Sequence, residues 1–201
     1  LDSVGNVVVA ASFAGKIDFG GGLLTSAGGN DVGLAKFTTG GLHLWSKRLG
    51  STGADNARGV AIDVFGTITL TGDFAASVDF GGGALASAGA TDVFVAKYDP
   101  LGAHLWSKRA GDAGAQVASG VAADATGVFV TGTFAGAIDF GGGSQASAGG
   151  GLLVGNGLGG DGIAPYFTAS MHGYTEPGMP TGHRFVAIRI EKTPGVRGHV
   201  R

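Results

Sequence analysis

The residues of this chain that could do chemistry recur at fixed distances along its 201 residues. Asp18 is followed by Phe and three Gly, and the same five-residue word returns at Asp79 and Asp139, 61 and then 60 residues further on. A carboxylate beside accessible backbone carbonyls offers the oxygen ligands that Ca²⁺ prefers. Each word supplies a single carboxylate, however, and none has the dense D-x-D-x-D spacing of a calcium loop. We therefore predict that these Asp side chains accept hydrogen bonds from the following Gly amides and fix a turn.

A second repeated word, Leu-Trp-Ser-Lys-Arg, follows a His in two copies. The two His would bind a metal only if the fold aimed both at one point, and we assign them no metal. Aromatic residues that recur once per repeat are typical of the core between repeats, and a Lys-Arg pair at a strand end is typical of a solvated rim facing nearby Asp. The residues concerned are His43 and His104, Trp45 and Trp106, Phe19, Phe80 and Phe140, and the pairs Lys47-Arg48 and Lys108-Arg109.

Residues 151–201 hold the remaining candidates for catalysis or ligand binding. Residues 155–160 read G-x-G-x-x-G after a short apolar run, the arrangement in which a helix N-terminus binds a dinucleotide. Pro165 follows at once and no helical periodicity comes after it, so we attribute the match to the 42 Gly of the chain. Neither a G-x-S-x-G elbow nor an H-E-x-x-H motif is present. Four tail residues could be assembled into a metal site, but their spacings fit no template: His172, Glu176, His183 and His199.

The composition argues against several classes of function. Lys and Arg number 13 and Asp and Glu 15, and this net charge of −2 provides no basic surface for nucleic acid. The absence of Cys excludes disulfides, thiolate metal ligands and a Cys nucleophile. No apolar run reaches the roughly 18–20 residues of a membrane span. We predict no catalytic residue, no metal and no cofactor.

Strand periodicity dominates residues 1–150. Apolar or small residues alternate at 7–13, 68–74 and 128–134. Further strands are expected at 31–37 and 92–98, at 43–48 and 104–109 after an Asp-Pro-x-Gly turn or its equivalent, and at 59–63 and 120–124. Residues 32–37 and 93–98 are apolar or small nearly throughout, which predicts strands buried on both faces. Each repeat thus provides about four strands and no helix, joined by a Gly-, Ala- and Ser-rich connection that contains the Asp-Phe-Gly-Gly-Gly word.

Four antiparallel strands per repeat of about 60 residues describe one blade of a β-propeller. We predict an all-β fold of tandem four-stranded antiparallel blades, with a β-trefoil as the alternative. The words Asp-Phe-Gly-Gly-Gly, Gly-x-His-Leu-Trp-Ser-Lys-Arg and Gly-Val-Ala-x-Asp, in this setting, resemble the SBBP β-propeller repeat family. That resemblance covers residues 1–150 and implies a seven-bladed propeller on a bacterial secreted or surface protein. It implies an extracellular or cell-envelope location and no shared catalytic residues.

The repeats divide the chain unevenly. We expect a partial blade at 1–56, a full blade at 57–117, a partial blade at 118–150 and a divergent tail at 151–201. The tail contains both Met and four of the five Pro. Within it we expect a strand at 183–190, which resembles the closing Gly-Phe-Arg-Val strand of formylglycine-generating-enzyme-like domains. About two and a half blades do not close a ring, so we expect a longer protein or self-association to complete the propeller.

The function that these observations favour is a non-enzymatic secreted or cell-surface scaffold that binds a protein or glycan ligand. Specificity is expected in the variable loops, above all the long connection around residues 75–91. The alternative is a fragment of a secreted enzyme whose catalytic part lies in the tail or outside this chain.

Overall fold

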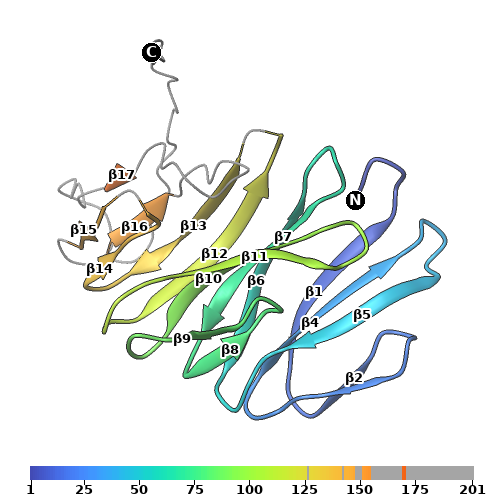
Figure 1. Ribbon diagram of the computed structural model, residues 1–201, viewed down its shortest axis with the longest axis horizontal. Coiled ribbons are helices and arrows are strands. Elements are labelled where there is room, and N and C mark those ends of the chain that lie inside the picture. Colours follow the sequence, from blue (N-terminus) through green and yellow to red (C-terminus); the bar gives the residue numbers. More distant parts are fainter. Residues whose placement is uncertain (126, 142, 148–150, 155–168, 171–201) are drawn as a thin grey trace, which may run out of the picture.

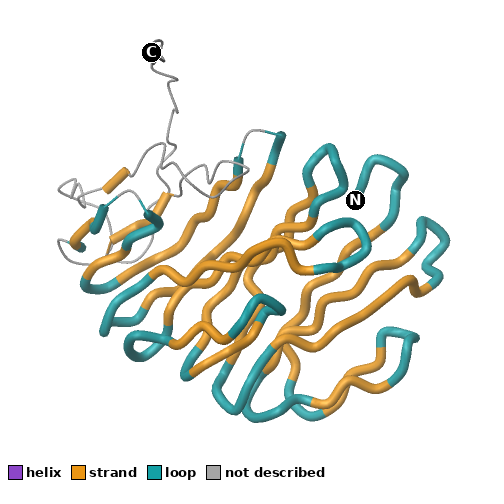
Figure 2. The backbone as a smooth tube through the Cα atoms, in the orientation of Figure 1, coloured by secondary structure: helices purple, strands orange, loops and turns teal. Residues whose placement is uncertain are grey.

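The computed structural model describes residues 1–125, 127–141, 143–147, 151–154 and 169–170. Every regular element in these residues is a β-strand, and the strands pair antiparallel (Figures 1 and 2). The expected all-β class is therefore confirmed. The described residues contain no helix with the length and apolar character needed to cross a membrane.

Three larger sheets contain most of the strands. The first sheet has the order β1-β4-β5 and consists of β1 (Val7–Phe13), β4 (Asp31–Phe37) and β5 (His43–Leu49). The second has the order β11-β10-β7-β6 and consists of β6 (Asp55–Ile62), β7 (Ile68–Phe74), β10 (Asp92–Tyr98) and β11 (His104–Ala110). The third has the order β12-β13-β16-β17 and consists of β12 (Gln116–Ala123), β13 (Val128–Phe134), β16 (Gly151–Val154) and β17 (Ala169–Ser170).

Three short hairpins accompany the sheets, one per repeat. They pair β2 (Lys16–Asp18) with β3 (Leu23–Thr25), β8 (Ser77–Asp79) with β9 (Ala84–Ala86), and β14 (Ala137–Ile138) with β15 (Gln145–Ala146). The sequence had predicted only a Gly-rich connection here, and that expectation is wrong. The connection folds back because Val78 and Phe80 are buried against the second sheet while the glycines between the strands allow a tight turn.

The long strands lie where the sequence predicts them, with one informative difference. The inner strands expected at 59–63 and 120–124 begin earlier, at Asp55 and Gln116. Their pairing shifts between Ala57 and Gly59 and between Ala118 and Gly120, which marks a β-bulge in each. Because a bulge breaks the two-residue alternation, the periodic signal in the sequence covers only the part of each strand that follows it.

The sheets stack face to face in a row (Figure 1), and the same two faces meet at each junction. Val32 and Leu34 of the first sheet pack against Ile68, Leu70 and other residues of the second, and Val93 and Val95 of the second pack against Val128 and Val130 of the third. All seven residues of β7 are buried, and so are all but one of β10. Strand β4 is likewise buried at every residue except Phe37, so the prediction that residues 32–37 and 93–98 form strands buried on both faces is confirmed.

The third sheet continues past residue 150. Strand β16 pairs with β13 as β10 pairs with β7, so a boundary at 150/151 falls inside this sheet. Residues 151–154 read Gly-Leu-Leu-Val where the second repeat has Asp92 and the apolar residues after it. The strand expected at 183–190 lies outside the described residues.

Candidate functional site

The repeated Asp-Phe-Gly-Gly-Gly word forms the turn of each short hairpin. In the first hairpin, the Oδ1 atom of Asp18 accepts hydrogen bonds from the amides of Gly20 (2.7 Å) and Gly22 (3.1 Å). The turn-fixing role predicted for this Asp is confirmed, and the second hairpin shows its electrostatic effect, because the equivalent bonds hold the pKa of the Asp79 carboxyl below its ordinary value. Equivalent bonds of 2.6–3.1 Å join Gly81 and Gly83 to Asp79, and Gly141 and Gly143 to Asp139.

Each of the three glycines in this turn has its own structural reason. Gly81 and Gly83 have φ angles of +116° and +105°, which residues with a side chain rarely adopt. Gly82 does not share this conformation, but a Cβ atom there would lie 2.3 Å from Cε1 of His104. The imidazole therefore packs directly on the turn, and only glycine fits beneath it.

Each of the two His side chains packs on the hairpin turn of its own repeat. In the first repeat, a Cβ atom on Gly21 would lie 2.1 Å from Cε1 of His43, the same relation as in the second repeat. Nε2 of His43 lies 3.0 Å from Oγ of Ser46. Nε2 of His104 is buried and has no hydrogen-bond partner among the described atoms. Packing on the turn therefore accounts for a His in each repeat without a ligand.

Trp45 and Lys47 join the first sheet to the second. A Cβ atom on Gly102 would lie 3.1 Å from the Trp45 ring, so the position expected for this Trp, in the core between repeats, is confirmed. The ammonium group of Lys47 donates a hydrogen bond to the carbonyl of Gly102 and lies 5.2 Å from the centre of the Tyr98 ring. Burial in this contact lowers the pKa of Lys47. The solvated rim predicted for Lys47 is therefore wrong, since its side chain belongs to the junction.

Phe80 and Trp106 lie at the two junctions of the second sheet, Phe80 toward the first sheet and Trp106 toward the third. Phe80 stacks on Phe94 at a ring-centre distance of 4.2 Å, within the cluster that also contains residues of the first sheet. Trp106 packs against the cluster that joins the second and third sheets, as does Phe140. The interior positions expected for these aromatic residues are confirmed.

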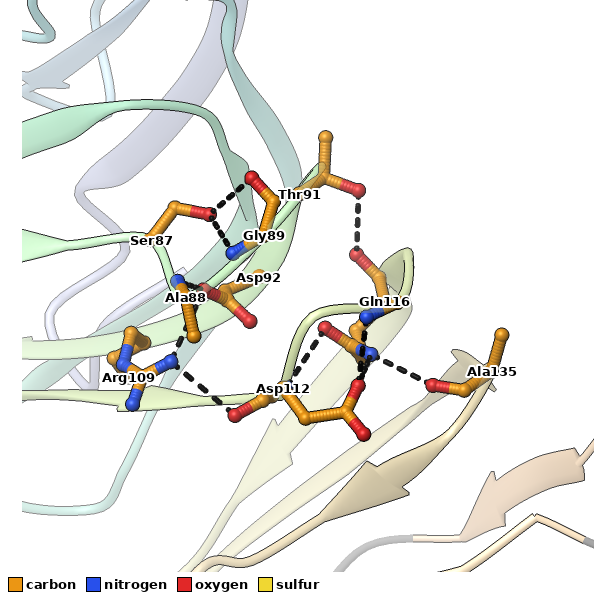
Figure 3. Close-up of polar contacts among 11 residues, drawn as sticks. Ser87, Ala88, Gly89, Thr91, Asp92, Arg109, Asp112, Gln116 and Ala135 are labelled. Carbon is orange, nitrogen blue, oxygen red and sulfur yellow. Dashed lines mark hydrogen bonds and ion pairs between the residues drawn. The ribbon is translucent and has the colours of Figure 1, made fainter.

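The Arg of each Lys-Arg pair faces an Asp, as predicted, but the sequence did not indicate which Asp or that its carboxylate is buried. Nη1 of Arg48 lies 2.6 Å from Oδ2 of Asp31, and Nη1 of Arg109 lies 3.1 Å from Oδ2 of Asp92. Both carboxylates are fully buried, whereas about a third of each Arg side chain is exposed. Asp92 also accepts the amide of Ala88, which attaches the end of the hairpin segment to strand β10 (Figure 3).

The junction of the second and third sheets has a fully bonded amide. Gln116, the first residue of β12, donates from Nε2 to Oδ1 of Asp112 and to the carbonyl of Ala135, both at 2.8 Å (Figure 3). Its backbone amide donates to the carbonyl of Thr91 at 2.9 Å. The amides of Gly114 and Ala137 keep the pKa of Asp112 below its ordinary value.

The junction of the first and second sheets has a carboxylate in the place of that amide. Asp55, the first residue of β6, donates its backbone amide to the carbonyl of Asn30 at 2.7 Å, and its Oδ2 accepts the amide of Ser51 at 2.7 Å. The Oδ1 atoms of Asp55 and Asp31 are both buried without a hydrogen-bond partner among the described residues. Burial, together with the charge of Asp31, raises the pKa of Asp55 above its ordinary value.

We expect the substitution Asp55→Asn to stabilise the protein at neutral pH. The raised pKa means that Asp55 contributes stability below its unfolded-state pKa and loses that contribution as the pH rises through its folded-state pKa. Removing the buried charge beside that of Asp31 should increase the free energy of unfolding at pH 7.5 by about 1–2 kcal/mol. The gain should shrink toward pH 4, as measured by urea unfolding at several pH values.

Asp112→Asn provides the matched control, because the pKa of Asp112 is shifted in the opposite direction. This variant should be less stable than the natural protein at neutral pH, and its deficit should disappear as the pH falls. A loss of stability in Asp55→Asn at pH 7.5 would contradict our interpretation of the buried carboxylate pair.

Sequence reasoning missed two sets of repeated charged residues. One set is Asp31 and Asp92, which bind the Arg residues. The other joins Lys36 to Asp2 at 3.0 Å and Lys97 to Asp63 at 3.4 Å, all with largely buried side chains. The available signal was recurrence at 61 residues in both members of each pair.

Exposed apolar side chains gather on the strand turns of the first two sheets. Within each sheet the two turns touch: a Cβ atom on Gly66 would lie 3.3 Å from Cγ of Pro100 in the second sheet, and a Cβ atom on Gly5 would lie 2.7 Å from Cγ2 of Thr39 in the first. We call the exposed residues on them the turn surface. It consists of Val4, Leu42, Val64, Phe65 and Leu101, with exposed fractions of 67–82 %.

No three His, Asp or Glu side chains come together as a metal site in the part of the chain that the structure describes. The G-x-G-x-x-G run at 155–160 lies outside those residues, and so do His172, Glu176, His183 and His199. The comparison with protein-family models gives no match, and the comparison with curated proteins gives none either.

Proposed function

We propose that this chain is a non-enzymatic β-propeller-repeat scaffold of a secreted or cell-surface protein, and that it binds a protein ligand. The three stacked sheets would be blades, as the resemblance to SBBP repeats implies. The observation that carries the proposal is that the repeated polar side chains make structural contacts, whereas a set of apolar side chains is left exposed. The repeated polar residues hold turns and junctions together, whereas the five apolar residues of the turn surface are largely exposed.

The turn surface has the character of a protein-binding site. Phe65 and Leu101 are 71 % and 82 % exposed, and both lie on turns that are themselves fixed. Asp63 accepts the amides of Phe65 and Thr67, each at 2.9 Å, and Asp99 accepts those of Leu101 and Ala103, each at 2.8 Å. A grouped set of exposed apolar side chains on rigid turns is typical of an interaction surface. The long connection at 75–91, where specificity is also expected, contains the hairpin of β8 and β9, which packs on the second sheet through Val78 and Phe80.

The proposal is tested with arrays of extracellular proteins and of glycans probed with the labelled chain. We expect binding to at least one protein, and a loss of at least tenfold in affinity for the double variant Phe65→Ser/Leu101→Ser. Leu23→Ser, which removes an exposed apolar residue from the first hairpin, should leave binding unchanged. Binding that is unaffected by the double variant, or turnover of a substrate in a hydrolase panel, would contradict the proposal.

A further inference from the structure

We propose that the outer face of the first sheet is a docking surface for a further sheet of the same repeat, one that presents apolar residues and a Trp-x-Lys strand. We call this face the acceptor face. It carries Val7, Val9, Ala11, Phe37 and Gly41. The inference rests on the stacking geometry and does not depend on the proposed ligand-binding role.

The second sheet shows what covers such a face. Its equivalent residues, Ile68, Leu70 and Tyr98, are fully buried beneath the first sheet. The strand pairing is the same in both repeats, since Val7 pairs with Phe37 and Val9 with Ala35 as Ile68 pairs with Tyr98 and Leu70 with Ala96. The two faces are therefore built alike.

Polar contacts fix the covering sheet in place. Lys36 of the first sheet donates to the carbonyl of Pro100 at 3.2 Å, and Lys47 donates to the carbonyl of Gly102 and lies over Tyr98. Trp45 packs against Gly102. The covering sheet thus contributes an apolar centre, two Lys and one Trp.

Several of the corresponding positions of the first sheet are more exposed, although Ala35, which pairs with Val9, is buried. Val9, the equivalent of Leu70, is 36 % exposed, and Phe37 is only half-buried. Gly41 has a φ of +81°, close to the +83° of Gly102, so the turn has the same conformation. Nothing lies within 4 Å of a Cβ atom on Gly41, whereas the Trp45 ring fills this place at Gly102. The turn at Gly41 therefore has the conformation that packs against a Trp ring at Gly102, and no described side chain packs there.

The occupant is defined by these contacts. It must bring a Lys to the carbonyl of Thr39, a second Lys to the carbonyl of Gly41 and over the Phe37 ring, and a Trp onto Gly41. The Trp-x-Lys faces of the first and second sheets are already used at the two junctions. In the third sheet, Ala169 of β17 pairs with Val154 as Lys108 pairs with Val95, so that sheet has no Lys at the position equivalent to Lys47. We therefore assign the face to an additional repeat sheet and not to a second copy of this chain.

One residue constrains the design of a test. A Cβ atom on Gly72 would lie 1.8 Å from the carbonyl oxygen of Asn56 on the bulged inner strand, but the equivalent of Gly72 in the first sheet is Ala11. A copy of strand β6 placed beside β1 would clash with Ala11. Every chain used in the test therefore carries Ala11→Gly.

The test inserts a copy of residues 1–61 before Leu1 of the full chain. This insertion is in register, because Leu1-Asp2 corresponds to Ile62-Asp63. The chain has no Cys, so Val9→Cys in the original copy provides a single thiol on the acceptor face. We compare its reaction rate with a thiol reagent in the unextended chain, in a chain extended only by residues 55–61, and in the chain extended by 1–61.

We expect the 1–61 extension to slow the thiol reaction at least tenfold relative to the strand-only extension. Trp45→Ala/Lys47→Ala in the inserted copy alone should restore the faster rate. Equal rates in the two extensions, or no effect of the double variant, would overturn the proposal. Two further results would overturn the proposal. One is a 1–61 extension that adds no β-sheet signal to the circular dichroism spectrum. The other is a thiol reaction rate in the unextended chain that falls as the protein concentration rises, which would identify a second copy as the occupant.

Discussion

The variant Gly72→Ala should lose at least about 3 kcal/mol of stability, a large part of the 5–15 kcal/mol that holds a typical domain folded. Gly72 lies at the centre of β7, and its missing side chain would point at the β-bulge of β6. A Cβ atom would lie 1.8 Å from the carbonyl oxygen of Asn56 and 2.7 Å from the Phe94 ring. The first contact involves backbone held by the sheet on one side and the bulge on the other. Relief therefore requires separation of the two strands, which urea unfolding would detect.

The chain provides its own control for this substitution. Among the described residues β1 pairs only with β4, and Ala11 stands where the second and third sheets have Gly72 and Gly132. Ala11→Gly should cost no more than about 1 kcal/mol, the ordinary penalty of Gly within a strand. If Gly72→Ala and Ala11→Gly had similar small effects, the bulged carbonyl would not be the reason for glycine at this position.

The variant Phe94→Ala should lose about 3–5 kcal/mol, because it empties the centre of the junction between the first and second sheets. Phe94 has no exposed surface, stacks on Phe80 at 4.2 Å and meets the Phe74 ring edge-on at 6.4 Å. Its loss would leave a cavity lined by the hairpin and by β7. The free energy of unfolding should fall without a change in the slope of the denaturant dependence.

Phe65→Ala is the matched control, since it removes the same side chain from a site that is 71 % exposed. Its expected effect is within about 0.5 kcal/mol. The first repeat shows what refilling the cavity of Phe94→Ala would require, which is a hairpin Phe packed directly on the strand. There, Gly33 takes the place of Phe94, and the Phe19 ring would come within 2.8 Å of a Cβ atom on Gly33. A substitution in the second repeat removes the Phe94 ring without moving Phe80 into its place.

The sequence predicts the long strands well because their apolar residues alternate, as at Val128, Val130 and Phe134. It predicts the turn role of Asp79 because the Gly amides that bind it follow within four residues. The hairpin of β8 and β9 escapes prediction, since three-residue strands of Ser, Ala and Val are too short to show a period. The local sequence pattern was therefore sufficient to predict those features whose contacts lie close together in the sequence.

Contacts between distant residues account for the rest. Lys47 was expected at a solvated rim because nothing near it in sequence indicates that Gly102, 55 residues later, presents a carbonyl to it. The reason for Gly82 is equally hidden, since it depends on His104. The tandem repetition did predict that Trp45 is structural, because a residue copied with its neighbours serves a relation that is also copied.

The stacking of the sheets has a direction. Each junction joins a Trp-x-Lys face to an unlike face, so the contact is heterologous and does not close on itself in pairs. Such a stack is a polymer with two different ends, and an in-frame duplication of one repeat adds a unit that already fits both neighbours. The same rule makes an uncovered end adhesive toward other chains. The length of the stack must therefore be limited by ring closure or by an end sheet that lacks one of the two faces. In the third sheet, Ala169 of β17 already stands at the position of Lys108.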